Sequence, residues 1–447
     1  MSMAAAGRAK HASRDPLGPA TRVFLIGVLA LLASVVTAGP ALSALSALSA
    51  LSDELPTTVG QVRWQSAAQF LPGVLLVPVV SRIGVGTRRR RTVLIVLLLV
   101  LAGTLLVALA TNHPLVVAGS ALSSLALAVI PACVASAHEA AGHTAAGAVA
   151  AVAVAAPLLA APLRYYGDRV LAVPPGVDLG PGFLPWTAVA FTVVALLVAW
   201  FTLTSPGWPV TPVRPGAVGI LLLGGTGVLT LAALFWVDSP WKAAVLVVTP
   251  GLLRVGRRYL PAVRRPWAPL PLALGLHGVP VLLVPLLVAS SAGDEYPRVM
   301  LCLAVATAGG GVLGILPTTP RRLLPAGFVV MAAACAWLAA THDGAWWTLI
   351  GGTTLLGLGA GLGIAAVTQT ALRLLPVAGA AGAVGVLQVV WAIGALFGAT
   401  VLLQGYEALG NALSPTLYVT AGALVLLTPF CRDHADVSRG TGGPSRP

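Results

Sequence analysis

The sequence has 447 residues, of which 57% are hydrophobic and only 9% are charged. Soluble globular proteins carry about 25% charged residues, so this composition cannot supply the polar surface of a soluble protein. A lipid bilayer is the solvent that tolerates it, and we predict an integral membrane protein. The net charge of +13 does not indicate a nucleic-acid partner, because the basic residues stand between apolar runs.

About fourteen apolar segments are long enough to cross a bilayer, which takes about 20 residues per helix. The first half of the chain contains six, at 22–51, 59–81, 92–112, 114–137, 144–164 and 186–204. A pair follows at 216–236 and 240–254, and its second member is short and contains a proline. The second half contains six more, at 267–291, 297–317, 323–341, 345–372, 379–404 and 413–431. We therefore expect an all-α integral membrane fold with about 14 transmembrane helices.

The basic residues are distributed unevenly between the two sides of the membrane. When the N-terminus is placed in the cytoplasm and the spans alternate, most arginines fall on the cytoplasmic side, including the run Arg88 to Arg91. Most acidic residues, such as Asp294 and Glu295, fall outside. This is the asymmetry of the positive-inside rule. We expect a multi-pass protein of the plasma membrane, with cytoplasmic tails at 1–21 and 432–447.

The sequence gives little support to metal, cofactor or enzyme chemistry. Four cysteines stand singly in or at the end of apolar runs, at Cys133, Cys302, Cys335 and Cys431. Glu139 has His138 and His143 nearby, but we predict a solvated cytoplasmic loop there rather than a metal site. No phosphate-binding Gly-Lys-Ser/Thr loop is present. We predict no metal, no cofactor and no enzymatic activity.

Two basic turns indicate an internal repeat. Ser81-Arg82-Ile83-Gly84 and the arginines at 88–91 follow the second span of the first half, and a turn ending in Arg321-Arg322 follows the second span of the second half. Both turns lie between the second and third helices of a six-helix block. Paired six-helix blocks are typical of secondary transporters, which bind substrate at the interface between the blocks.

Over residues 22–431 these features resemble the major facilitator superfamily, and within it the fourteen-helix drug–proton antiporter branch. The most specific stretch, 349–400, has a glycine-rich helix, a short basic turn and a second helix of small residues. Trp64 and the segment Ala156 to Ala161 are also similar to motifs of that branch. The resemblance implies two six-helix bundles, at 22–204 and 267–431, joined by an inserted helix pair and cytoplasmic linker at 205–266.

The sequence departs from that family at positions linked to proton coupling. Ser81 stands where the family usually has an aspartate, and residues 119–131 of the fourth span lack the Arg and Gln of proton-coupled members. The first span also has no aspartate before Asp53 at its outer end. The residues through which the family usually couples transport to protons are therefore missing.

Several residues are candidates for gating. Four glycines, Gly357, Gly359, Gly361 and Gly363, are predicted to give one helix a single face without side chains, against which neighbours can slide. Pro157 and Pro162 are predicted to let the fifth span bend. The basic turn is either a topology signal or a gate latch, and its candidates are Ser81, Arg82, Gly84, Arg88 and Arg89.

Candidate substrate contacts are uncharged side chains within the spans. His277 is the one titratable candidate at mid-membrane, where it either carries a proton or packs as a neutral ring. Gln388 and Trp391 lie three residues apart on one helix face, where they either hold an apolar, partly aromatic ligand or pack between helices. Weaker candidates of the same kind are Gln69, Ser123, Ser124 and Gln369.

We therefore expect a secondary active transporter that exports hydrophobic small molecules, a drug or a natural product, by alternating access. Proton coupling is left open. The expected partners are the hydrophobic substrate, the lipid bilayer and, in the coupled case, protons, with no nucleic acid and a monomeric state. Two alternatives remain, a flippase of lipid-linked precursors and an uncoupled transporter-like protein that binds or senses a ligand.

Overall fold

The computed structural model describes residues 18–46, 72–73, 75–77, 79–81, 88–159, 162–163, 183–203, 278, 295–316, 320–341, 345–373, 380–389, 391, 409 and 412–432. All regular elements in these residues are helices. Four candidate residues lie outside the described part, and these are Gln69, Arg82, Gly84 and His277. The inserted pair at 216–254 also lies outside it, so the number fourteen stays a prediction.

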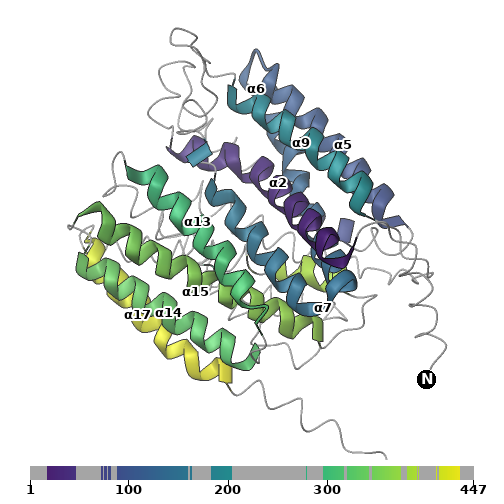
Figure 1. Cartoon of the computed structure of the whole chain (residues 1–447). Helices are drawn as coiled ribbons and strands as arrows, with labels where there is room; N and C mark the ends of the chain where they lie inside the picture. The colour runs from purple at the N-terminus through teal and green to yellow at the C-terminus, as the bar shows by residue number, and fades with distance from the viewer. Residues whose placement is uncertain are drawn as a thin grey trace, which may run out of the picture.

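The helices run side by side in two groups (Figure 1). The first group contains α2 (Pro19–Ser46), α5 (Arg89–Ala108), α6 (His113–Ser123), α7 (Ile130–Ala155) and α9 (Phe183–Thr202), with the 3₁₀ segments η2 (Ser124–Val129) and η3 (Ala156–Leu159). The second contains α13 (Tyr296–Leu313), α14 (Pro320–Thr341), α15 (Trp346–Arg373), the helix Ala380–Val389 and α17 (Leu413–Arg432). We name these groups the first and second bundle. The described helices coincide with the spans predicted from hydropathy.

Six helical segments of the described part are long and apolar enough to cross a membrane. One of them, His113–Leu159, has 47 residues and would be about 70 Å long as a straight helix, more than twice the hydrocarbon thickness of about 30 Å. It turns at Gly142, where φ is 87° and ψ is −175°. This conformation is accessible to glycine and strongly disfavoured for other residues. The segment therefore supplies two spans, with the break at the predicted place, 138–143.

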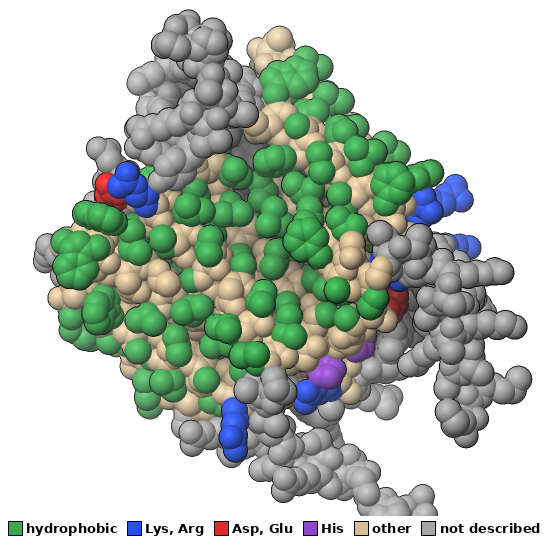
Figure 2. Space-filling model, viewed as in Figure 1, with side chains coloured by type: hydrophobic (Ala, Val, Ile, Leu, Met, Phe, Trp, Pro, Cys, Tyr) green, Lys and Arg blue, Asp and Glu red, His purple; other side chains and the backbone are tan. Residues whose placement is uncertain are grey.

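The outer surface of the described helices is apolar over a broad band (Figure 2). Large side chains face outward in both bundles, with Leu98 55%, Phe201 69% and Leu426 72% exposed. Such a surface is stable against lipid and would be costly in water. Charged residues gather at the two ends of the band. We name the end with Arg89, Arg322 and Arg373 the arginine end.

Each bundle has its own apolar core. One cluster of buried residues comes mainly from the first bundle and includes Ile26 and Leu97, and the other comes mainly from the second and includes Phe328 and Leu338. Leu127 packs against both clusters. The two bundles touch where α7 packs on α13 and α15. We name this contact, together with the contacts of the helix Ala380–Val389, the seam.

The glycines of α15 do not form a single face, so that prediction is wrong. A Cβ on Gly357 would lie 2.6 Å from the carbonyl oxygen of Leu303 in α13, whereas a Cβ on Gly359 would lie 2.8 Å from the carbonyl oxygen of Gly327 in α14. The reason is helical geometry, since each residue turns the helix by about 100° and residues two apart lie on nearly opposite sides. The glycines therefore let α15 pack closely against two neighbours.

Candidate functional site: the seam between the two bundles

At the arginine end, described residues close the seam through contacts that only glycines allow. A Cβ on Gly147 of α7 would lie 2.9 Å from the carbonyl oxygen of Ala365 in α15. A Cβ on Gly385 of the second bundle would lie 2.6 Å from the hydroxyl oxygen of Ser81, which is 2% exposed. Neither contact leaves room for a larger side chain. Close contacts of this kind hold helices by shape rather than by charge.

Ser81 explains how this end closes without the aspartate that the family resemblance led us to expect. Its side chain packs directly against Gly385 across the seam. The side chain of an aspartate there would be larger than that of serine, and the contact with Gly385 has no spare space. A small neutral residue is compatible with the tight contact.

Gln369 lies beside the same closure. It is fully buried and donates from Nε2 to the carbonyl oxygen of Gly314, at 2.9 Å. That bond joins the end of α13 to α15 within the second bundle. A Cβ on Gly147 would lie 3.1 Å from the Cγ of Gln369, so the side chain also abuts the first bundle. Gln369 therefore packs at the closure, and its predicted contact with substrate stays a prediction.

A 3₁₀ segment, η2, lies between α6 and α7 and reaches the seam. Irregular stretches within a long helix often mark hinges. The carbonyl oxygen of Leu127 in η2 accepts a hydrogen bond of 3.3 Å from Nε2 of Gln388 in the second bundle. Leu127 is twelve residues from Glu139, or roughly 18 Å along a helix, which is near the middle of a bilayer of about 30 Å.

Two further polar atoms lie on the same helical face as the Gln388 amide nitrogen. The amide oxygen of Gln388 and the indole nitrogen of Trp391 are buried and have no hydrogen-bond partner among the described residues. The structure thus brings Gln388 to the seam, while Trp391 is partly buried and packs against the core cluster of the second bundle. Their role in binding substrate stays a prediction.

Ser123 and Ser124 bond within their own helix. Ser123 donates to the carbonyl oxygen of Ser120 at 2.9 Å, and Ser124 donates to that of Ala121 at 2.7 Å. Both hydroxyl groups are buried and donate to carbonyls one turn earlier in the chain. No bond of either residue to the second bundle is seen in the described part. Their predicted contact with substrate remains untested.

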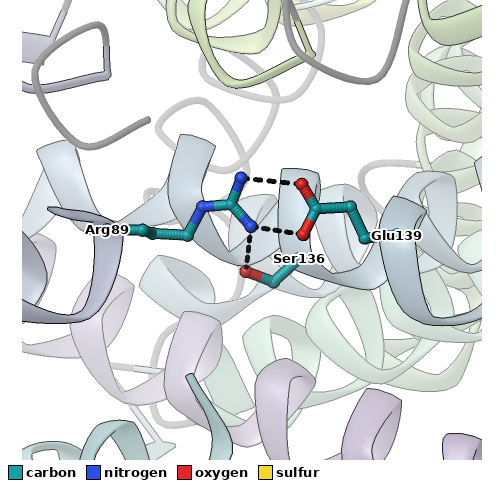
Figure 3. A network of polar contacts seen from close by, with 3 residues as sticks. All are labelled: Arg89, Ser136 and Glu139. Atoms are coloured by element: carbon teal, nitrogen blue, oxygen red, sulfur yellow. Dashed lines mark hydrogen bonds and ion pairs between the residues drawn. The ribbon is translucent and has the colours of Figure 1, made fainter. Parts of the chain in front are cut away.

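Arg89, Ser136 and Glu139 form a polar network at the arginine end (Figure 3). The guanidinium group of Arg89, 2% exposed, donates to both carboxylate oxygens of Glu139 at 2.6 and 2.8 Å and to the hydroxyl of Ser136 at 3.2 Å. The prediction of a solvated loop at Glu139 is therefore wrong. The residue lies in α7, and its charge is satisfied by an arginine that the linear sequence places 50 residues away.

This network bears on the predicted gate latch. Arg89 and Glu139 both belong to the first bundle, so their ion pair does not cross the seam. Arg88 is exposed and directly precedes α5, and the guanidinium group of Arg90 lies 4.2 Å from the ring centre of Trp200 in α9. Arg89 and Arg90 therefore hold α5 within its own bundle.

The prolines of the fifth span lie where the regular helix ends. Pro157 is part of η3, which continues α7 as a 3₁₀ segment, and Pro162 is buried in the short helical piece at 162–163. A proline cannot donate a backbone hydrogen bond, which favours such a change of helix type. Their predicted role in bending during transport is untested.

The sequence did not point to the Leu127 carbonyl or to Ser136. Whether a backbone carbonyl accepts a hydrogen bond from a distant side chain depends on the local backbone geometry. The residues of η2 show no pattern that predicts a 3₁₀ segment. Ser136 lies three residues before Glu139, on the same helical face, which is a spacing that could have suggested a shared partner.

Comparison with known proteins gives the fold class. No family model matches this sequence, and the curated proteins contain no match to it. The structure is similar to those of the human organic anion transporter MFSD10 and the E. coli fucose:proton symporter FucP. Each has a TM-score of 0.60 and 15% identity over 92% of this chain and 98% of the other. It is also similar to the proton:xylose symporter XylE, with a TM-score of 0.60 and 12% identity over 92% of this chain and 94% of the other.

The chain therefore has the all-helical fold of the major facilitator superfamily, as the sequence predicted. The proteins of similar structure are an organic anion transporter and two proton symporters. At these identities the similarity defines the fold, and the substrate has to be argued from the chain's own residues.

Proposed function

We propose that the chain is a secondary active transporter that exports hydrophobic small molecules by alternating access, in the manner of the fourteen-helix antiporters that its sequence resembles. The observation that carries the proposal is the seam. Among the described residues, the small-residue contacts of Gly147 with Ala365 and of Ser81 with Gly385 close it at the arginine end. Contacts of this kind separate and re-form without breaking an ion pair or exposing a buried charge.

The charges of the described part fit rocking of two intact bundles. The buried ion pair of Arg89 and Glu139 lies within the first bundle, so it stays intact while the seam opens. The separate apolar cores of the two bundles likewise favour movement of each bundle as a unit. Rocking of one repeat against the other around a central site is the general mechanism of transporters built from paired blocks.

The orientation follows from the basic residues. We place the arginine end in the cytoplasm, because loops rich in arginine are retained on that side of the plasma membrane. Both tails are then cytoplasmic, and the pair of Glu295 and Arg298 lies at the outer end. In this orientation the contacts of Gly147 with Ala365 and of Ser81 with Gly385 close the seam toward the cytoplasm.

Proton coupling is the part of the proposal that rests on the sequence only. His277 is the one titratable residue expected at mid-membrane, and it is our candidate for a proton carrier. An uncoupled transporter, or a transporter-like sensing protein, is the alternative. A flippase of lipid-linked precursors is less well supported, because the buried Arg89 is already neutralised by Glu139 and is not free to hold phosphate.

Transport by the purified protein in proteoliposomes tests the proposal. Efflux of chloramphenicol and of tetraphenylphosphonium would be followed with and without a pH gradient, with protein-free liposomes as the control. We expect the protein to move at least one of these hydrophobic compounds faster than the control. Movement of neither, in both conditions, would contradict the proposal.

A further inference from the structure

Unpaired polar atoms at the seam provide information on the chemistry of the substrate. Among the described residues, the amide oxygen of Gln388 and the indole nitrogen of Trp391 have no hydrogen-bond partner although they are buried. They lie three residues apart and share a helical face. One is an acceptor and the other a donor, so together they offer a neutral, two-point hydrogen-bonding site. Buried polar groups without partners are costly, which favours a ligand that completes them.

The bond between Gln388 and Leu127 places the Gln388 amide at the seam, and Trp391 follows three residues later on the same helical face. Nε2 of Gln388 donates to the carbonyl oxygen of Leu127 in the first bundle. The amide oxygen of the same Gln388 side chain has no partner among the described residues. Because the two unpaired atoms have almost no exposed surface with the seam closed, a ligand reaches them only when the bundles separate. Occupancy of this site is therefore tied to movement of the bundles.

The stretches that supply the described contacts at mid-depth of the seam contain no charged residue. The sequence has no Asp, Glu, Lys or Arg in 114–137, 346–372 or 379–404, the stretches that supply Leu127, α15 and the Gln388 helix. The ion pair of Arg89 and Glu139 lies at the arginine end and is already complete. An ionic substrate at mid-depth would have no counter-charge from these stretches, and burying an unpaired ion is strongly unfavourable.

We infer that the seam binds an uncharged substrate that carries a hydrogen-bond donor beside an acceptor, as in an amide, and pairs these groups with the Gln388 amide oxygen and the Trp391 indole nitrogen. This rests on the proposed function and narrows its substrate class. It excludes lipophilic cations and phosphate-linked lipids as preferred substrates.

Exchange across proteoliposomes tests the substrate class without requiring a driving force. Vesicles are loaded with an unlabelled compound and placed in a solution that contains a labelled form of it. Exchange by the protein is measured as transient accumulation of the label inside the vesicles. Three hydrophobic probes are compared: chloramphenicol, which is uncharged and has an amide N–H beside a carbonyl, the cation tetraphenylphosphonium, and the anion naphthalene sulfonate. We expect exchange of chloramphenicol and none of the two ions above the level of protein-free vesicles.

Two variants test the residues. Gln388→Met keeps a side chain of similar length without the amide, and Trp391→Phe keeps an aromatic ring without the N–H. We expect each to lower chloramphenicol exchange by about tenfold or more, because a buried hydrogen-bonding group of the substrate loses its partner. Trp346→Phe is the matched control, since Trp346 is 49% exposed at the end of α15 and its replacement should leave exchange unchanged.

The possible outcomes separate this inference from the proposed function. If the parent protein exchanges either ion, and both variants exchange that ion at the same rate, the inferred substrate class is wrong. The proposed transport function is still supported in that case. Exchange of chloramphenicol that neither variant reduces would overturn the assignment of the two residues. Exchange of none of the three probes by a folded protein would count against the proposed function and against this inference with it. Because Trp391→Phe does not disturb the bond to Leu127, it remains informative if Gln388→Met fails to fold.

Discussion

The guanidinium group of Arg89 donates to both carboxylate oxygens of Glu139, at 2.6 and 2.8 Å, and so joins the first turn of α5 to α7 just before its turn at Gly142. Arg89 is 2% exposed, and Ser136 provides a third hydrogen bond. A paired arrangement of this kind satisfies two charges that would be costly alone. The arginine end of the first bundle is therefore organised around one buried ion pair.

Removal of the carboxylate should destabilise the protein strongly. In Glu139→Ala, Arg89 would remain buried with a positive charge and without its main acceptor. We expect a loss of about 3 kcal/mol in the free energy of unfolding. The measurement is unfolding of the purified protein in detergent, followed by intrinsic tryptophan fluorescence.

The pair of Arg298 and Glu295 provides a matched control, because its side chains are 48% and 29% exposed. Solvent-screened pairs contribute little, so Glu295→Ala should cost about 1 kcal/mol or less. Equal losses for the two alanine variants would contradict the distinction between a buried pair that organises the bundle and an exposed one that does not.

Gly142→Ala should destabilise the turn between the two spans of the segment His113–Leu159. No atom lies within 4 Å of a Cβ placed on Gly142, so the cost comes only from the backbone conformation, with φ at 87°. We expect a loss of about 1–3 kcal/mol in the free energy of unfolding. Gly309→Ala is the control, because its Cβ is equally unobstructed but Gly309 lies within the helix α13. There alanine should be neutral or stabilising, and an equal loss would refute the argument.

Gly385→Leu should prevent closure of the seam at the arginine end. Its side chain would have to occupy the place of the Ser81 side chain, since a Cβ on Gly385 already lies 2.6 Å from the Ser81 hydroxyl oxygen. We expect the bundles to separate at this end. Spin labels on Ala141 and Arg373, which are exposed in the first and second bundle, report their separation in a background without native cysteines.

Gly309→Leu is the control for that measurement, because no atom lies within 4 Å of its Cβ. The distance between the labels should be longer in Gly385→Leu than in the parent and unchanged in Gly309→Leu. The same distance in all three proteins would show that the contact with Ser81 does not set the closure.

His277→Ala tests the proton pathway predicted from the sequence. An imidazole titrates near neutral pH and can carry a proton through a site without other titratable groups. We expect the variant to lose accumulation driven by a pH gradient and to keep exchange in the absence of a gradient. Full retention of gradient-driven accumulation would show that protons do not move through His277.

Much of the fold follows from the sequence, because the bilayer imposes simple rules. An apolar run of about 20 residues has few stable structures other than a spanning helix. Hydropathy therefore located α5, α9, α13 and the other described helices, and also the break near Gly142. The glycines of α15 show where a sequence pattern alone is insufficient. Because they are spaced two residues apart, they contact two neighbouring helices and do not form one face.

The candidate site was only partly predictable. The spacing of Gln388 and Trp391 places them on one face, and the apolar context places that face inside the protein. The partner of Gln388, the Leu127 carbonyl, is 261 residues away in sequence and lies in a 3₁₀ segment that no residue type specifies. The burial of Glu139 was not predictable for a similar reason, because its partner Arg89 comes from a distant part of the chain.

The separation of the bundles at the arginine end is the most direct test of alternating access. Spin labels at Ala141 and Arg373 would be measured in nanodiscs with and without a transported compound. We predict a short distance for the closed seam and a second, longer distance, with populations that change when the compound is added. A single short distance in every condition would contradict the account, because the two bundles would then not move against each other.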